Sequence, residues 1–286
     1  MPPGRPEVAD TLAWPGSLLV VGCGNMGGAM LAGWLAAGGG AGDKGCLDPA
    51  RVTVVDPVLA AAPAGVTLLR TLPADGRFDA ILLGVKPQLL DEVAPVLAPL
   101  VGSDTVLLSI LAGVELASLA ERFPAARAPV RIMPNLAAAI GKSPVALASD
   151  AAAEGLRAQV TALMAPLGQP EWVPEALFDA VTALAGSGPA FVYRFIDALA
   201  QAGAGLGLPA DQSQRLALAM VEGAGLLAAS SGQAPGDLAR RVASPGGTTE
   251  AGLRVLDAGG ALGDLVAACL TAARDRGVEM AAAARG

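Results

Sequence analysis

A glycine-rich loop near the N-terminus has the spacing of a dinucleotide-binding motif. The pattern is G-x-G-x-x-G, and its residues are Gly22, Cys23, Gly24, Asn25, Met26 and Gly27. The loop follows a short apolar run at 17–21 and precedes a helical pattern at 26–37, the context that makes this motif meaningful. In that setting its backbone can approach a pyrophosphate and the helix N-terminus can bind it. The motif therefore predicts binding of NAD or NADP, and a tight turn without a ligand is the alternative.

A carboxylate follows the second predicted strand. Asp56 could accept hydrogen bonds from the adenosine ribose hydroxyls, although it could equally form an ordinary turn before a proline. It lies farther past the glycine motif than the usual ~20 residues, and the glycine-rich insert 38–45 accounts for the difference. No basic residue directly follows Asp56 to bind a 2′-phosphate, which favours NAD over NADP. Either Arg51 or Arg70 could still approach this place in the fold.

Two further loops follow apolar runs at 79–85 and 105–110. Doubly wound sheets bind ligands at the carboxyl ends of their strands, so both loops are candidates for the cofactor site. The first loop contains Lys86, one of only three lysines in the chain, and the second contains Ala112, which would permit close approach. A solvated loop charge and a plain turn are the respective alternatives.

The composition excludes several classes of protein. Histidine is absent, which removes His-based triads and imidazole metal sites, so we expect no metal. Twenty-six acidic and 19 basic residues give a net charge of −7, so nucleic acid is not an expected partner. The cysteines Cys23, Cys46 and Cys269 are odd in number and share no short spacing, which favours a reducing cytoplasm.

The elements that must position these loops alternate in the first half of the chain. Apolar, strand-like runs occur at 17–21, 51–55, 79–85, 105–110, 130–133 and 144–148, and helical patterns occur at 26–37, 89–100 and 114–123. This alternation predicts an α/β fold with a Rossmann-type, doubly wound parallel sheet. From residue 178 onward the pattern is only helical, with breaks at 186–189, 207–209, 230–235 and 244–247. We therefore expect a Rossmann domain at 1–172 and an all-α domain at 173–286.

The mean hydropathy of +0.54 raises the question of a membrane span. The longest uncharged segment includes 22–42, but nine of those 21 residues are glycine, and each costs a helix roughly 1 kcal/mol relative to alanine. No basic region precedes it as in a secretory signal. We therefore expect no membrane association.

Several motifs occur in the order seen in pyrroline-5-carboxylate reductases. They lie at 22–27, 85–88, 131–135, 179–190 and 244–249, and the last two are the most specific. The chain resembles this family from about residue 17 to 280. The resemblance implies reduction of 1-pyrroline-5-carboxylate to L-proline by NAD(P)H, the last step of proline biosynthesis. It also implies a helical substrate-binding and dimerisation domain, a homodimer, and further assembly into a ring of dimers.

The resemblance implies roles for individual residues. Residues 22–27 would hold the pyrophosphate. The residues expected to flank the ribose and nicotinamide are Gly84, Val85, Lys86, Pro87, Ile110, Leu111, Ala112, Met133 and Asn135. Those expected to hold the substrate are Ser244, Gly246, Gly247, Thr248 and Thr249. The chain departs from the family at Arg70-Thr71-Leu72, near the place before the 85–88 loop where an asparagine is frequent, at Asp56-Pro57, and at Phe191, where a tyrosine is usual. The first two departures leave the choice of NAD or NADP open.

The implied chemistry is compatible with a chain that has no histidine. A protonated cyclic imine is already a strong hydride acceptor, so the enzyme can act mainly by positioning. The hydroxyl of Thr249, before a predicted helix at 250–256, could hydrogen-bond the ring nitrogen, and the amides of Gly246 and Gly247 suit a carboxylate. Capping of that helix by Thr249 is the alternative.

Two other functions share parts of this pattern. A β-hydroxyacid-dehydrogenase-like reductase has the same two-domain plan but resembles enzymes with a lysine on the long inter-domain helix, and no lysine follows Lys142. A non-catalytic nucleotide-binding sensor would keep the fold, yet it has no need of the intact 244–249 loop.

Overall fold

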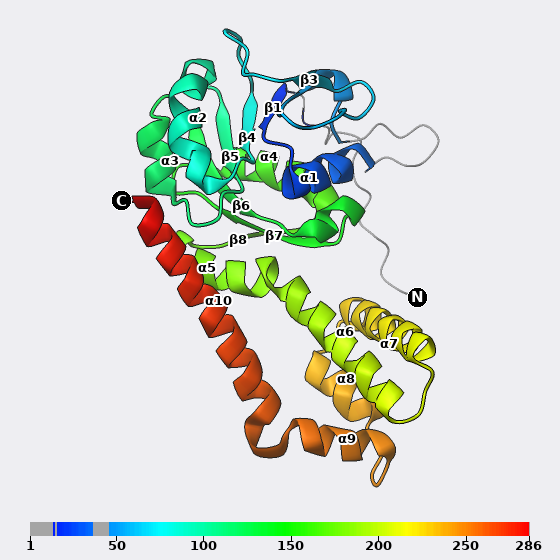
Figure 1. Cartoon of the computed structure of the whole chain (residues 1–286). Coiled ribbons are helices and arrows are strands. Elements are labelled where there is room, and N and C mark those ends of the chain that lie inside the picture. The colour runs from blue at the N-terminus through cyan, green and yellow to red at the C-terminus, as the bar shows by residue number, and fades with distance from the viewer. Residues whose placement is uncertain (1–13, 15, 37–45, 286) are drawn as a thin grey trace. The chain divides into compact units, whose positions relative to one another are not determined.

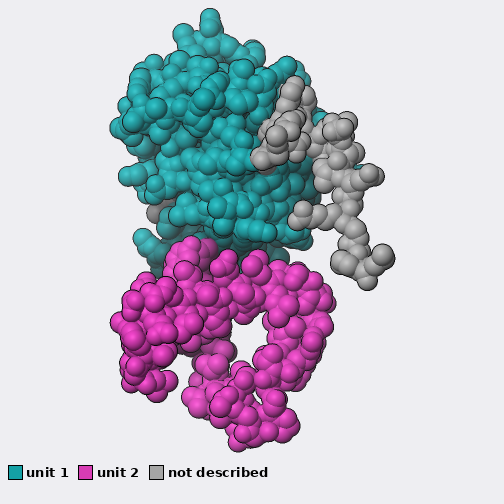
Figure 2. Space-filling view, turned by 90° about the vertical axis from the view of Figure 1, so that its right-hand side faces the viewer, with its two compact units in different colours: residues 1–186, 274–286 teal, residues 187–273 magenta. Residues whose placement is uncertain are grey.

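The computed structural model describes residues 14, 16–36 and 46–285 (Figure 1). The glycine-rich insert 38–45, which we expect to lengthen the path to Asp56, lies outside the described residues. Within the described part the chain forms two compact units, shown in Figure 2. The first unit comprises residues 1–186 and 274–286, and the second comprises 187–273.

The first unit is built on one eight-stranded sheet with the order β3-β2-β1-β4-β5-β6-β7-β8. Its strands are β1 (Leu18–Val21), β2 (Val52–Val55), β3 (Thr67–Leu69), β4 (Ala80–Leu83), β5 (Val106–Ser109), β6 (Ala128–Met133), β7 (Ser143–Ala148) and β8 (Gly168–Trp172). All neighbouring pairs are parallel except β6 and β7. The order 3-2-1-4-5-6 is that of the Rossmann fold, which confirms the predicted fold class.

Both faces of the sheet are buried beneath helices. Alternate residues of a strand point to opposite faces: Leu18 and Val20 belong to one hydrophobic cluster, and Leu19 and Val21 to another. The first cluster includes buried side chains of α1 (Asn25–Ala36) and α4 (Glu154–Met164). The second includes those of α2 (Leu90–Leu97) and α3 (Leu116–Arg122). Burial on both faces explains why the central strands are uninterrupted apolar runs rather than alternating ones.

Two strands and one helix of the first unit were not predicted from the sequence. Strand β3 has only three residues, which is too short for a periodic signal. Strand β8 reads GQPEW and alternates between half-buried and exposed residues, so its composition indicates a loop. It is parallel to β7, an arrangement that comes from the sheet and not from its own residues. Helix α4, the helix that was not predicted, follows β7 and precedes β8 along the chain. Its side chains Leu156, Val160 and Leu163 are buried.

The second unit is helical, as predicted. Its helices are α6 (Gly188–Gly205), α7 (Ala210–Ser231), α8 (Pro235–Val242), α9 (Thr248–Leu256) and the first part of α10 (Ala261–Arg285). The compact units divide after residue 186, later than the predicted domain boundary after 172, because the short α5 (Phe178–Val181) packs in the first unit. There Phe178 forms a buried cluster with Met133, Ala146 and Ala148. The boundary at 172 stays a prediction for the functional domains.

Candidate functional site

The glycine motif forms a turn that brings the carboxyl ends of three strands together. Gly22 has φ +86° and donates its N–H to the Val55 carbonyl over 2.9 Å, while Gly84 donates to the Val21 carbonyl over 2.8 Å. A Cβ on Gly22 would lie 2.8 Å from the Gly84 carbonyl, and one on Gly84 would lie 2.5 Å from the Gly22 oxygen. Neither position has room for a side chain. The turn after β1 and the loop after β4 are therefore in backbone contact.

The other two glycines of the motif have different surroundings. A Cβ on Gly27 would lie 2.7 Å from the Gly22 oxygen, so this glycine permits the close packing of α1 against the turn. Gly24 is exposed, and a Cβ there would meet no atom within 4 Å. The open space lies beside the N-terminus of α1, whose first amides have no partner within the helix. A backbone cradle with free space beside a helix N-terminus fits the pyrophosphate of a dinucleotide.

Asp56 binds the glycine turn to the loop that follows β2. Its side chain is buried, with 6% of the residue exposed. Oδ2 accepts the N–H of Cys23 over 2.8 Å, and Oδ1 accepts those of Val58 and Leu59, each over 2.9 Å. Burial opposes ionisation, but these three hydrogen bonds and the positive charge of Arg70 outweigh it and lower the pKa of Asp56. The carboxylate is therefore ionised and already holds three backbone amides.

The two arginines considered near the ribose lie at opposite ends of the sheet. Arg51 precedes β2 and pairs with Asp48 over 3.9 Å, so it lies at the amino ends of the strands. Arg70 follows β3 at the carboxyl ends, and its Nη1 donates to the Asp56 carbonyl over 3.2 Å. Arg70 is thus the arginine that the fold places beside Asp56.

Replacing Asp56 with asparagine is expected to destabilise the protein by about 1–3 kcal/mol at pH 7, because the side chain loses its charge and one of its two acceptor oxygens, which leaves at least one backbone amide without an acceptor. The pKa of Asp56 is lower in the folded protein than in the unfolded chain, where it is about 3.9, so this stabilisation is fully present above pH ~4 and is lost as the pH falls through the folded-state pKa. Urea unfolding of wild type and Asp56→Asn at pH 7 and pH 3 measures the difference. A difference that stays constant between the two pH values would contradict this account.

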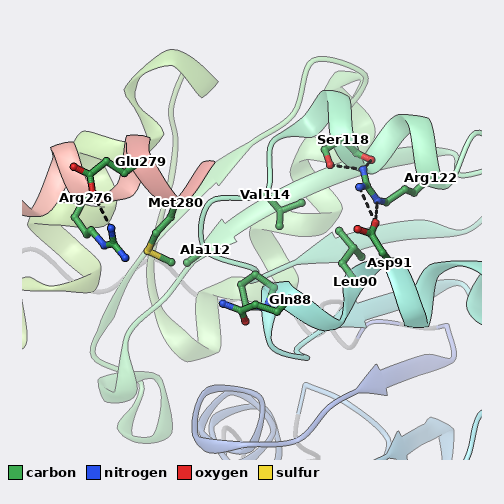
Figure 3. A pocket seen from close by; sticks show the side chains of 11 residues that line it. Gln88, Leu90, Asp91, Ala112, Val114, Ser118, Arg122, Arg276, Glu279 and Met280 are labelled. Carbon is green, nitrogen blue, oxygen red and sulfur yellow. Dashed lines mark hydrogen bonds and ion pairs between the residues drawn. The ribbon is translucent and has the colours of Figure 1, made fainter. Parts of the chain in front are cut away.

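A cavity of about 380 Å³ lies in the first unit where the loops after β4 and β5 meet α2 and α3 (Figure 3). Its lining residues are Pro87, Gln88, Leu90, Asp91, Ala112, Val114, Ser118, Arg122, Arg276, Glu279 and Met280. It includes Pro87 and Ala112 from the two predicted cofactor loops, while Lys86 is exposed beside it. Sequence reasoning missed the last three lining residues, which belong to α10.

The loop after β5 depends on a glycine for its contact with α10. Gly113 has φ +76°, and a Cβ there would lie 3.2 Å from the backbone of Met280 and Ala281. No sequence signal could have placed this Ala-rich C-terminal helix beside a loop that lies more than 150 residues earlier in the chain. Its end therefore forms one wall beside residues 110–112.

Met133 and Asn135 contact the segment that leads to the second unit. Asn135 is buried; Oδ1 accepts the Ala137 N–H over 2.9 Å, and Nδ2 donates to the Ala185 carbonyl over 3.0 Å. A Cβ on Gly186 would lie 3.2 Å from Sδ of Met133. Residues 182–186 form a π-helical turn, a feature frequent at functional sites. Asn135 thus uses both polar atoms to hold this turn and its own loop.

The predicted substrate loop lies in the second unit. Gly246 has φ +71° and donates its N–H to Oε2 of Glu250 over 2.7 Å, and Gly247 donates to the Ser244 carbonyl over 2.9 Å. The N–H groups of Gly246 and Gly247, which we expected to bind the substrate carboxylate, therefore donate hydrogen bonds within the loop. Because α9 begins at Thr248, two residues earlier than predicted, the first-turn amides of Thr248 and Thr249 have no partner within the helix.

Thr249 does not cap α9. The N-cap residue is Gly247, and no side chain makes a capping hydrogen bond there. Thr249 lies in the first turn, and its residue is exposed. Its hydroxyl is thus not needed by the helix terminus, which removes the capping alternative and leaves the role in substrate binding as a prediction.

Comparison with known proteins identifies the family. Residues 175–280 match the family model described as pyrroline-5-carboxylate reductase dimerisation. The chain is 38% identical over 247 residues to a pyrroline-5-carboxylate reductase of Glycine max, covering 82% of this chain and 88% of that protein. A Pseudomonas aeruginosa reductase of the same name is 38% identical over 205 residues, 71% of this chain and 75% of that protein.

Solved structures agree with these relatives. A pyrroline-5-carboxylate reductase from Coxiella burnetii superposes with a TM-score of 0.82 at 28% identity, covering 93% of this chain and 98% of that one. A Plasmodium falciparum pyrroline carboxylate reductase with NADP bound gives 0.79 at 25% identity, with the same coverage. The chain belongs to the pyrroline-5-carboxylate reductase family.

Proposed function

We propose that this protein reduces 1-pyrroline-5-carboxylate to L-proline with NADH or NADPH, the last step of proline biosynthesis. The observation that carries the proposal is the combination, within a chain of this family, of an open glycine turn and a free helix N-terminus. The turn suits a dinucleotide, since Gly24 faces empty space. The N-terminus of α9 suits the carboxylate of an imino acid, since no side chain caps it.

When bound, the nicotinamide would supply a hydride to the carbon of the protonated imine, and the ring nitrogen, which already carries its proton, would become the amine of proline. The residues of this chain bind and orient. Residues 22–27 hold the pyrophosphate, with Asp56 fixing their turn through Cys23. The first-turn amides of α9 bind the substrate carboxylate, and the hydroxyl of Thr249 hydrogen-bonds the ring nitrogen. Among the described residues no group of three acidic or cysteine side chains could hold a metal, and this chemistry needs none.

Mixing the purified protein with cofactor and 1-pyrroline-5-carboxylate tests the proposal. We expect oxidation of NADH or NADPH in step with the formation of L-proline. A nucleotide sensor would bind the cofactor without turnover. A β-hydroxyacid-dehydrogenase-like reductase would instead act on hydroxy acids, and its lysine role is vacant because no lysine follows Lys142.

NADH is expected to serve at least as well as NADPH. The ionised carboxylate of Asp56 can accept the ribose 2′-hydroxyl, whereas it repels a 2′-phosphate by on the order of 1 kcal/mol or more at close range. Measuring kcat/KM for both cofactors gives the answer. A large preference for NADPH would mean that Arg70, which lies beside Asp56, binds the phosphate in place of the carboxylate's contact with the ribose.

We further propose that the protein forms a homodimer through its helical domain and assembles into a ring of dimers. Many large apolar side chains of the second unit are exposed, among them Tyr193, Phe195, Leu206, Leu216, Leu218, Met220, Leu226, Leu227, Val255 and Leu265. Within the described residues, the helical run 175–205 is also long and apolar enough to cross a membrane. The dimerisation region of the family includes this run. We therefore propose that a second copy of the chain, and not a membrane, buries these apolar side chains.

Leu227 on α7 provides a test of the dimer. It is 60% exposed, and we place it in the proposed dimer contact, where burial of a glutamate would cost free energy. Leu227→Glu is expected to raise the dissociation constant of the dimer at least ~100-fold, from a loss of about 3 kcal/mol or more. Gln212→Glu on the same helix adds the same charge at an exposed polar position and is the control. Light scattering at low micromolar concentration measures the mass, and a monomeric wild type would contradict the proposal.

The proposed location is the cytoplasm. The described cysteines are free thiols, with Cys23 buried and Cys269 exposed. Burial, together with the negative charge of Asp56, raises the pKa of the Cys23 thiol. Cys23 is therefore a small side chain at the turn and not a reactive thiolate.

A further inference from the structure

An ion pair between a buried arginine and a half-buried glutamate connects the segments that carry the predicted nicotinamide loops. Arg131 lies in β6, two residues before Met133, and its side chain is 4% exposed. Its Nη1 lies 3.0 Å from Oε1 of Glu175, the first residue of the 3-10 turn Glu175–Leu177. The guanidinium also stacks 4.1 Å above the centre of the Phe178 ring. Both partners therefore hold the segment that leads to the π-helical turn against β6.

The same carboxylate oxygen holds a third element. Oε1 of Glu175 accepts the backbone N–H of Leu116 over 2.6 Å. Leu116 is the first residue of α3, which directly follows the loop after β5. In the sheet, Arg131 is the register partner of Ser109, the last residue of β5. One carboxylate thus connects the start of α3, strand β6 and the segment after β8, and β6 in turn pairs with the end of β5.

A contribution to folding stability does not by itself explain why the chain has the Arg131–Glu175 ion pair. Within the described residues, Nε of Arg131 is buried and has no hydrogen-bond partner. A buried guanidinium with an unpaired donor costs free energy, and replacing a buried ion pair by apolar side chains of similar volume is often neutral or stabilising. A methionine at position 131 could fill the same space, but it could not make a directional contact with Glu175 and, through Glu175, with Leu116.

We propose that Arg131 and Glu175 are positioning residues that hold the loops at 110–112 and 133–135 in the geometry that receives the nicotinamide. This inference rests on the proposed function. Both loops follow strands at the carboxyl edge of the sheet, where doubly wound folds bind their ligands. Asn135 and Met133 contact residues 185 and 186 of the π-helical turn. The Arg131–Glu175 pair holds the segment that leads to this turn, so it also supports the turn that Asn135 and Met133 contact.

The test compares binding of NADH with binding of ADP-ribose, which lacks the nicotinamide. In Arg131→Met of the full chain, the dissociation constant of NADH should rise on the order of 10- to 100-fold, as for loss of the support behind a binding group. ADP-ribose contacts the glycine turn and should bind within about twofold of wild type, since that turn is untouched. Calorimetry measures both constants without any imine substrate.

Arg157 provides a matched control. Its guanidinium stacks 4.7 Å above the Trp172 ring and donates to the carbonyls of Ser149 and Ala152, so it too is a packed arginine of the first unit. None of these three contacts involves residues 110–112 or 133–135. Arg157→Met should lower the melting temperature yet leave the ratio of the two dissociation constants unchanged.

If the ratio of the NADH and ADP-ribose dissociation constants is the same in Arg131→Met as in wild type, whether both affinities fall in parallel or neither changes, the proposal is overturned. The ion pair would then be a stabilising contact only. If Arg131→Met does not fold, Glu175→Gln decides, because its amide oxygen can still accept from Leu116 while the charge is lost. We then expect a smaller rise in the same ratio, and an unchanged ratio would again overturn the proposal. Absence of proline formation by the wild type would instead refute the proposed function, so the two failures are distinguishable.

Discussion

Thr249→Val is expected to lower kcat/KM for 1-pyrroline-5-carboxylate by about 30- to 1000-fold. The substitution nearly preserves the shape of the side chain but removes the hydroxyl that we assign to the ring nitrogen. One lost hydrogen bond to a reacting group costs roughly 2–4 kcal/mol, by analogy with oxyanion donors. Cofactor affinity should stay almost unchanged, since the glycine turn belongs to the other compact unit.

Thr249→Ser is the control for this prediction, because it keeps the hydroxyl and should retain much of the activity. Since α9 is capped by Gly247 without a side-chain bond, the valine variant should unfold within about 0.5 kcal/mol of wild type. Steady-state kinetics and thermal melts measure both effects. If Thr249→Val keeps nearly the wild-type kcat/KM, the hydroxyl has no part in the reaction and only the loop backbone remains as the substrate site.

Gly24→Ala is expected to weaken cofactor binding while leaving the free protein intact. A Cβ at this position meets no protein atom within 4 Å, so the fold has room for it. The same space is where the backbone must approach the pyrophosphate, and overpacking costs typically about 1–3 kcal/mol. That range corresponds to a roughly 5- to 150-fold rise in the dissociation constant of NADH.

Gly155→Ala is the matched control. Gly155 is exposed in the first turn of α4, and a Cβ there also meets nothing within 4 Å. Calorimetry with NADH should show the loss for Gly24→Ala alone, and both variants should melt close to wild type. Equal NADH affinity in wild type and Gly24→Ala would show that the open space beside the turn is not the pyrophosphate site.

The parts of this fold that could be predicted are those whose signal is local. The runs that form β1, β4 and β5 are buried on both faces, so their apolar residues are continuous and easily recognised. Strand β8, with a glycine, a glutamine, a proline and a glutamate in five residues, forms because β7 offers it a partner. No local pattern records such a partner.

The candidate site divides in the same way. The glycine motif and Asp56 could be located because strand ends and glycine spacing are visible in the sequence. The use of the Asp56 oxygens by Cys23, Val58 and Leu59 could not, since it depends on the path of the chain after β2. The connection of Glu175 to Arg131, 44 residues earlier, likewise exists only in the folded sheet.

The most direct test of the central claim is to follow the hydride itself. Purified protein would be incubated with 1-pyrroline-5-carboxylate and with NADH or NADPH that carries deuterium at both C4 positions of the nicotinamide, and the product analysed by mass spectrometry and NMR. We expect L-proline that carries deuterium at the former imine carbon, in a one-to-one ratio with oxidised cofactor. Cofactor binding with no labelled proline, with either cofactor, would contradict it.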